Sequence, residues 1–197
     1  MPTNLLRKAI WKIFVLRKKA SSPDSLNKMS NHKFEIINLK LRKLEPSDLP
    51  FLYQWENDAS AWADGDNHNP LSRQDLRNYI ESTTGDIYRD GQLRLIIEEN
   101  GLTLGCIDLF DLDPRNRKAA LGMYIAPEHR GKGAGKSALE QLEAFAFGHL
   151  RLRLLYAVIA TSNIPCSALY RSAGYQPSSP LPAWTLESPA VIWTKIR

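Results

Sequence analysis

Apolar and polar positions alternate along much of the chain after residue 34 and predict an ordered series of strands and helices. Residues 34–44 (FEIINLKLRKL) show the period of two that a half-buried strand requires. Two helical patterns follow at residues 47–58 and 72–83, and the second begins with the S-x-x-D form of a capping box. Residues 92–112 form two strand-like runs around Gly101, which predicts a β-hairpin.

The second half of the chain alternates strands with helices. An apolar strand pattern ends at Pro127, and residues 134–147 carry small and apolar side chains on one helical face. Residues 153–160 (RLLYAVIA) are almost wholly apolar, as in a strand covered on both faces. A short helix follows, with an Asn cap at its start and Gly174 at its end, and two further strands close the chain, near Tyr175 and at AVIWTKI. This order predicts a mixed α/β domain.

The first residues form a separate segment. Residues 4–19 place an apolar stripe on one helical face with cations around it, and SSPDS then breaks the pattern. Such a helix could lie on an anionic membrane surface or dock on a partner. Met29 precedes SNHKFEI, which reads as a natural beginning, so residues 1–28 could also be disordered or follow from a misplaced start codon. We therefore divide the chain into an extension and linker at 1–33 and a domain at 34–197.

Charge and composition narrow the possible functions. Residues 1–28 hold seven basic side chains against one acidic, whereas the remainder holds 19 basic and 20 acidic. The domain thus lacks the basic excess typical of nucleic-acid binders. The chain has no run of 18 apolar residues and only two distant cysteines, which favours a cytoplasmic location. His68 and His129 have no partners at metal-ligand spacing, so we expect no metal.

The stretch APEHRGKGAGKSALEQL (residues 126–142) joins a strand to a helix through three glycines. Glycines let a backbone approach an anion closely, and the free N–H groups of a helix start can bind phosphate. The spacing of Gly131, Gly133 and Gly135 fits neither the Walker G-x-x-x-x-G-K-[ST] pattern nor the dinucleotide G-x-G-x-x-G pattern. The loop therefore predicts a phosphate site of another kind, with a ligand-free turn as the alternative.

This loop resembles the acyl-CoA loop of the GNAT acetyltransferases, whose pattern is Q/R-x-x-G-x-G/A. A second GNAT motif, N-x-x-A/S-x-x-L-Y, matches Asn163 to Tyr170 and continues to Gly174-Tyr175. The resemblance covers roughly residues 36–197 and is nearest the branch of ribosomal-protein N-terminal and spermidine/spermine acetyltransferases. It implies a GNAT fold, a central twisted mixed sheet of six to seven strands flanked by about four helices.

The resemblance also implies how acetyl-CoA binds. The loop amides would hold the CoA pyrophosphate, and two splayed strands would hold the pantetheine arm. The cofactor-binding residues it implies are Met123, Tyr124, Ile125, Arg130, Gly131, Lys132, Gly133, Ala134, Gly135, Lys136 and Asn163. An amide of Met123 or Ile125 would polarise the thioester carbonyl. Gly122 is consistent with a bulge beside them, or is simply a weak point in the strand.

Tyr170 is implied as the general acid towards the CoA thiolate, with a packed core tyrosine as the alternative. The general base is harder to assign. Members of the family carry a glutamate at the positions of Val158 or near Ala120, and this chain has neither. Asp108 is a weak candidate, and Asp111 should face the opposite side of a regular strand. Asp113, just beyond that strand, and Glu98, on the strand before it, are the other carboxylates considered.

Residues 55–70 (WENDASAWADGDNHNP) lie where the family lines its acceptor site. Trp62, Asp64 and Asp66 could recognise a cationic amine, or belong to an ordinary polar loop. We thus predict an N-acetyltransferase that moves acetyl from acetyl-CoA to a polyamine-like small amine or a protein N-terminus through a ternary complex. The alternative is a non-catalytic CoA-sensing module, and a homo-oligomer is possible.

Overall fold

The computed structural model describes residues 39–58, 70–182 and 189–197. The N-terminal extension, including the membrane-surface helix expected at 4–19, lies outside the described residues, as do Trp62, Asp64 and Asp66. Among the described helices, none is long and apolar enough to cross a membrane.

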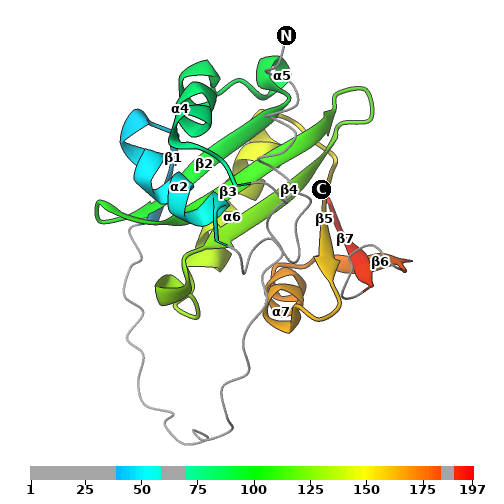
Figure 1. The fold of residues 1–197 in the computed structure, drawn as a ribbon. Helices are drawn as coiled ribbons and strands as arrows, with labels where there is room; N and C mark the ends of the chain where they lie inside the picture. Colours follow the sequence, from blue (N-terminus) through cyan, green and yellow to red (C-terminus); the bar gives the residue numbers. More distant parts are fainter. Residues whose placement is uncertain (1–38, 59–69, 183–188) are drawn as a thin grey trace, which may run out of the picture.

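The described chain builds one seven-stranded sheet in the order β1-β2-β3-β4-β5-β7-β6 (Figure 1). Only the pair β4·β5 is parallel within this sheet, and the other neighbours are antiparallel. The strands are β1 (Leu39–Lys43), β2 (Gln92–Glu99), β3 (Leu102–Asp113), β4 (Lys118–Ile125), β5 (Leu154–Ala160), β6 (Gln176–Leu181) and β7 (Ala190–Ile196). The mixed sheet confirms the predicted fold class.

Helices cover the two faces of the sheet unequally (Figure 1). The described helices are α2 (Leu49–Glu56), α4 (Arg73–Ser82), α5 (Ile87–Asp90), α6 (Ala134–Glu143) and α7 (Ile164–Ser172), and a short 3₁₀ turn, η1 (Pro46–Asp48), precedes α2. The apolar face of α6 packs on one side of the sheet, with Leu139 and Leu142 fully buried against strand residues such as Ile107. A second core lies on the other side, where α2 and α4 pack against Ile96 and Cys106.

Most of the predicted elements form, and their boundaries follow the cap signals. Ser72 and Asp75 make the reciprocal capping box of α4. The Asn163 side chain accepts a hydrogen bond from the Cys166 amide and caps α7. Gly174 follows that helix with a φ of 88°, a conformation that favours glycine. The helix predicted at 134–147 instead ends at Glu143 and continues as a π-helical turn to His149.

The prediction that residues 153–160 form a strand covered on both faces is wrong for one face of β5. Leu155, Ala157 and Ile159 are buried on the α6 side. Tyr156 and Val158 alternate with them and are only half-buried. Helices α2 and α4 pack on β2, β3 and β4, so the opposite face of β5 stays more open. The apolar side chains of β5 thus pack into the core on one face and line a partly open surface on the other.

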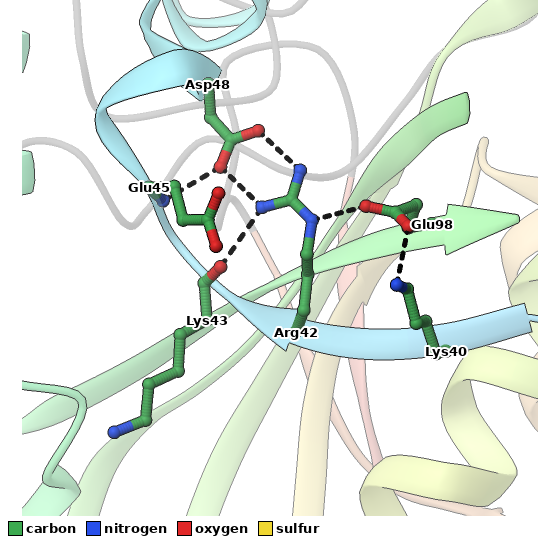
Figure 2. Close-up of polar contacts among 6 residues, drawn as sticks. All are labelled: Lys40, Arg42, Lys43, Glu45, Asp48 and Glu98. Carbon is green, nitrogen blue, oxygen red and sulfur yellow. Dashed lines mark hydrogen bonds and ion pairs between the residues drawn. The ribbon is translucent and has the colours of Figure 1, made fainter. Parts of the chain in front are cut away.

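Arg42 ties the first strand to the entrance of α2, as Figure 2 shows. Its guanidinium donates to both carboxylate oxygens of Asp48 at 2.7 Å and to Glu98 Oε2 at 2.5 Å. The Asp48 side chain is 2% exposed, and its Oδ2 also accepts from the Glu45 amide at 2.9 Å. These contacts explain the sequence LRKLEPSDL at residues 41–49: Arg42 and Asp48 fix η1, and with it the direction of α2, against the sheet.

We expect Arg42→Ala to lower the free energy of unfolding by roughly 2–3 kcal/mol, because it leaves the buried Asp48 carboxylate without its cation. Urea denaturation measures this difference. Lys40→Ala is the matched control, since Lys40 pairs with the same Glu98 at 2.8 Å but is 63% exposed. Its cost should stay within about 0.5 kcal/mol. Equal costs for the two variants would contradict the assigned role of Arg42.

Candidate active site

The parallel strands β4 and β5 separate soon after they meet. They pair at three positions, Lys118 with Leu154, Ala119 with Leu155, and Ala120 with Tyr156. Beyond Ala120, β4 stays paired with β3 as far as Ile125, while β5 stays paired with β7 as far as Ala160. Each strand follows its outer neighbour, so a wedge-shaped gap opens between them.

A cavity of about 780 Å³ occupies this gap and continues between α6 and α7. Its lining comes from β4, the glycine loop, β5 and α7. Of the residues implied in the sequence, it includes Met123, Ile125, Arg130, Gly131, Gly133, Ala134, Gly135, Lys136, Asn163 and Tyr170. Tyr124 and Lys132 are not in the lining. The Tyr124 side chain packs instead on Trp55 across the sheet, with ring centroids 5.3 Å apart, and Lys132 is exposed.

The glycine loop has the backbone geometry that an anion site needs. Gly131 and Gly133 have φ values of 74° and 90°, and Gly133 is the N-cap of α6. The amides at the start of α6 therefore lie at one end of the cavity, where the helix dipole adds positive potential. A Cβ on Gly135 would lie 3.3 Å from both Leu169 and Met123. The loop thus fits the pyrophosphate of acyl-CoA, and Gly135 keeps the space between β4 and α7 open.

Arg130 contributes to this loop through its backbone position more than through its charge. Its Nε donates to the Ile125 carbonyl oxygen at 2.7 Å, and its guanidinium carbon lies 5.7 Å from the centre of the Tyr124 ring. The side chain therefore folds back onto the end of β4 and braces the loop. Lys136, which is exposed and lines the cavity, is the cation better placed to meet a phosphate there.

Tyr170 lies at the other side of the cavity, on α7. Its side chain is 2% exposed and packs edge-on against Tyr175, with ring centroids 5.0 Å apart. Burial raises the pKa of the Tyr170 phenol well above its ordinary value, so the phenol is protonated at neutral pH. A phenol in that state can donate a hydrogen bond to a departing thiolate. Because a thiol has the lower ordinary pKa, near 8.5, transfer of the proton requires that the same buried setting also destabilises the thiolate.

Cys166 also lines the cavity, one helical turn before Tyr170. Burial raises the pKa of its thiol to about 12, so it is neutral at physiological pH. A neutral thiol is a weak nucleophile. The arrangement therefore favours direct attack by an amine over transfer of the acyl group through Cys166.

Gly122 lies on the face of β4 that points away from α6. Ala120, Gly122 and Tyr124 alternate onto the side of α2 and α4, and Gly122 lines the cavity. A Cβ on Gly122 would meet only Phe110, at 3.4 Å. The pairing of β3 with β4 runs without interruption past Gly122, so the bulge considered from the sequence is absent there. Gly122 instead leaves this point of the cavity wall without a side chain, beside the expected thioester position, and we call this place the Gly122 opening.

Asp108 lies opposite Gly122 on β3, and both of its oxygens are engaged. Arg94 Nε and Nη2 donate to them at 2.8 and 2.9 Å, and Arg94 Nη1 donates to Glu56 Oε1 at 2.6 Å. Arg94 is 2% exposed and Glu56 is fully buried. We infer that Asp108 is a structural ion-pair partner, which makes it poorly suited to the role of base considered from the sequence.

Glu56 was not singled out by the sequence, although it is the last residue of α2 and lies in the acidic stretch. Burial raises the pKa of its carboxyl to about 7, and Arg94 opposes this shift. Arg94 shares its single charge between two carboxylates, so the second one remains costly to ionise. Only a fold that brings residues 56, 94 and 108 together reveals this group.

The sheet order, the wedge between β4 and β5 and the loop at the start of α6 together define an acyl-CoA-dependent transferase. A sequence model of the acetyltransferase (GNAT) domain matches residues 38–176, more than half of the chain, and the chain belongs to that family. It is an N-acetyltransferase, and acetyl-CoA is its co-substrate.

Named relatives agree with this assignment. Spermidine N(1)-acetyltransferase of Escherichia coli K12 is 27% identical over 141 residues, covering 70% of this chain and 73% of that protein. A putative ribosomal N-acetyltransferase of Bacillus subtilis is 36% identical over 76 residues, covering 39% of this chain and 42% of that protein. The crystal structure of Vibrio cholerae spermidine N-acetyltransferase with CoA and spermine shares the fold, with a TM-score of 0.71 and 23% identity over 81% of this chain and 95% of that one.

The raised pKa of Glu56 makes a prediction about stability. The ordinary pKa of a glutamate is 4.5, and that of Glu56 in the folded protein is about 7. At a pH between these two values, Glu56 holds a proton in the folded protein that it has lost in the unfolded chain. Stability from this group is therefore present at low pH and falls as pH rises through that window, by about 3 kcal/mol. In urea titrations from pH 5 to pH 8, we expect Glu56→Gln to remove most of this decline.

Glu140→Gln is the control for this measurement, because Glu140 is exposed on α6. That variant should retain the decline of the wild type. A decline that persists unchanged in Glu56→Gln would show that Glu56 titrates normally despite its burial.

Proposed function

We propose that the acceptor is a polyamine-like small amine, which attacks acetyl-CoA directly in a ternary complex. The observation that carries this proposal is the charge around the Gly122 opening. Glu56 and Asp108 share one cation, Arg94, so the group becomes net negative as Glu56 ionises, above its raised pKa of about 7. Asp111, also on β3, adds an exposed carboxylate nearby. Negative potential at a narrow opening attracts a cationic amine.

Each step of the proposed reaction is assigned to particular residues of the chain. The loop amides from Gly131 to Gly135 would hold the pyrophosphate, and the amide of Met123 or Ile125 would polarise the thioester carbonyl. Tyr170 would donate a proton to the thiolate as the carbon–sulfur bond breaks. The acidic loop at 55–70, with Trp62, Asp64 and Asp66, remains a proposed part of the acceptor site.

Further support comes from the relatives. Those named spermidine acetyltransferases match about 70% of this chain, and one solved relative contains spermine. A protein N-terminus is the second candidate, because the more similar segment of 76 residues matches a putative ribosomal acetyltransferase. We also propose a cytoplasmic location, supported by the two free cysteines. Assembly into a homo-oligomer is supported by a relative described as dodecameric.

The test is release of free thiol from acetyl-CoA across an amine panel of spermidine, spermine, diamines, amino sugars and peptides with free N-termini. We expect turnover with the polyamines and little with the peptides. Tyr170→Phe should lower kcat by about 10²-fold or more, because the acid is lost, while the Kd for CoA measured by calorimetry stays unchanged.

Two outcomes would contradict the proposal in different ways. Turnover of peptides without turnover of polyamines would favour the protein N-terminus. Tight CoA binding without thiol release for any amine would favour the alternative of a CoA-sensing module.

A further inference from the structure

Strand β3 leaves its regular pairing just beside the active site. Its register with β4 shifts between Phe110 and Asp113, and Asp111 has a φ of 50°. In a regular strand Asp111 would face away from Asp108. The bulge instead turns Asp111 towards Tyr156, whose hydroxyl donates a hydrogen bond to Asp111 Oδ2. Contrary to the expectation from the sequence, Asp108 and Asp111 therefore lie on the same face of the sheet.

The position of Tyr156 fixes where this carboxylate lies. Tyr156 pairs with Ala120 at the last contact between β4 and β5. The next residues along the two strands, Leu121 and Ala157, already line the cavity. Tyr156 faces away from α6, as does Val158, which also lines the cavity. Its phenol reaches from β5 past the small Ala120 to β3, so Asp111 lies just beyond the closed end of the gap, outside the cavity lining and on the same face of the sheet as Gly122.

The partner of Asp111 distinguishes it from its neighbours. Asp108 pairs with Arg94, Glu98 with Lys40 and Arg42, and Asp113 with Lys118. Within the described part of the chain, Asp111 has no such cation, and it is exposed. A neutral phenol orients the carboxylate without cancelling its charge. Burial and the nearby Asp111 and Asp113 raise the pKa of Tyr156, so the phenol remains a donor at neutral pH.

We propose that Asp111 receives the ammonium group of the acceptor beside the thioester and accepts its proton, and that Tyr156 is a positioning residue that holds the carboxylate. This inference rests on the proposed function. The ammonium gives one proton to Asp111, which passes it to solvent, and the freed amine attacks the carbonyl carbon. As the carbon–nitrogen bond forms and the carbon–sulfur bond breaks, the nitrogen loses a second proton to solvent. Tyr170 protonates the thiolate and regains its own proton from solvent, so the reaction releases one proton in total.

Asp111→Asn tests this role with little risk to the fold, because asparagine also tolerates a positive φ. With the amine that the wild type turns over best, we expect kcat/KM to fall about 10²-fold at pH 7, and the Kd for CoA to stay unchanged. The defect should shrink as pH approaches the amine pKa of about 10, because the amine then arrives already deprotonated. Asp113→Asn, which removes the same charge two residues away, should change kcat/KM less than about 3-fold. Tyr156→Phe should show a smaller loss with the same pH trend.

The outcomes separate this inference from the proposed function. If the wild type acetylates peptides or amino sugars instead of polyamines, the proposed acceptor class is wrong, and Asp111→Asn is tested with that amine. If the wild type is active and Asp111→Asn retains its kcat/KM, Asp111 has no such role. A loss that is the same at every pH, or is matched by Asp113→Asn, would indicate a structural or long-range charge effect and would also overturn the inference.

Discussion

The structure depends on the point where β4 and β5 stop pairing, after Ala120 and Tyr156. Beyond it each strand follows its outer neighbour, so the facing strand edges have no strand partner across the gap. Backbone N–H and C=O groups in such a position are costly unless something pairs with them. An extended pantetheine arm can do so, and the cavity beside Met123 and Ile125 has room for it. Because the strands separate here, Tyr156 lies at the closed end of the gap, and the glycine loop that follows β4 lies at its open end.

Two polar groups keep the proposed acceptor side of this gap in place. Arg42 holds η1 and α2 against β1 through Asp48 and Glu98. At the other end of α2, Glu56 meets Arg94 and Asp108 inside the core. Such buried ions are a weak source of stability, because desolvation offsets their attraction. They do fix the orientation of α2, and once Glu56 ionises, above its raised pKa, they leave an excess of negative charge beside Gly122. Structural position and acceptor electrostatics thus come from the same residues.

Most of the residues expected on the donor side come together in one cavity, whereas those of the proposed acceptor side were not apparent as a group from the sequence. Residues 126–142 and the pair Asn163 and Tyr170 carry local motifs, and local spacing is enough to place a loop, a cap and a helix. Glu56, Arg94 and Asp108 come from three separate elements, and no local pattern brings them together. The orientation of Asp111 was predicted wrongly for another reason. Strand periodicity assumes a regular strand, and the bulge after Phe110 turns Asp111 to the face of the sheet opposite to the predicted one. Tyr156 was not recognised because it lies within an apolar run, which predicts a strand that is buried on both faces.

In the proposed ternary complex, acetyl-CoA lies in the gap on the α6 side, and the amine enters past Gly122 from the opposite face of the sheet. A crystal structure of the protein with a bisubstrate analogue, in which spermine is joined to CoA through an acetyl linker, measures this directly. We expect the pyrophosphate at the amides of Gly131 to Gly135, the linker beside Tyr170, and the polyamine passing Gly122 with a nitrogen within hydrogen-bond distance of Asp111. A polyamine chain that leaves the gap between α6 and α7, with Gly122 and Asp111 free of contact, would show that the amine does not enter past Gly122.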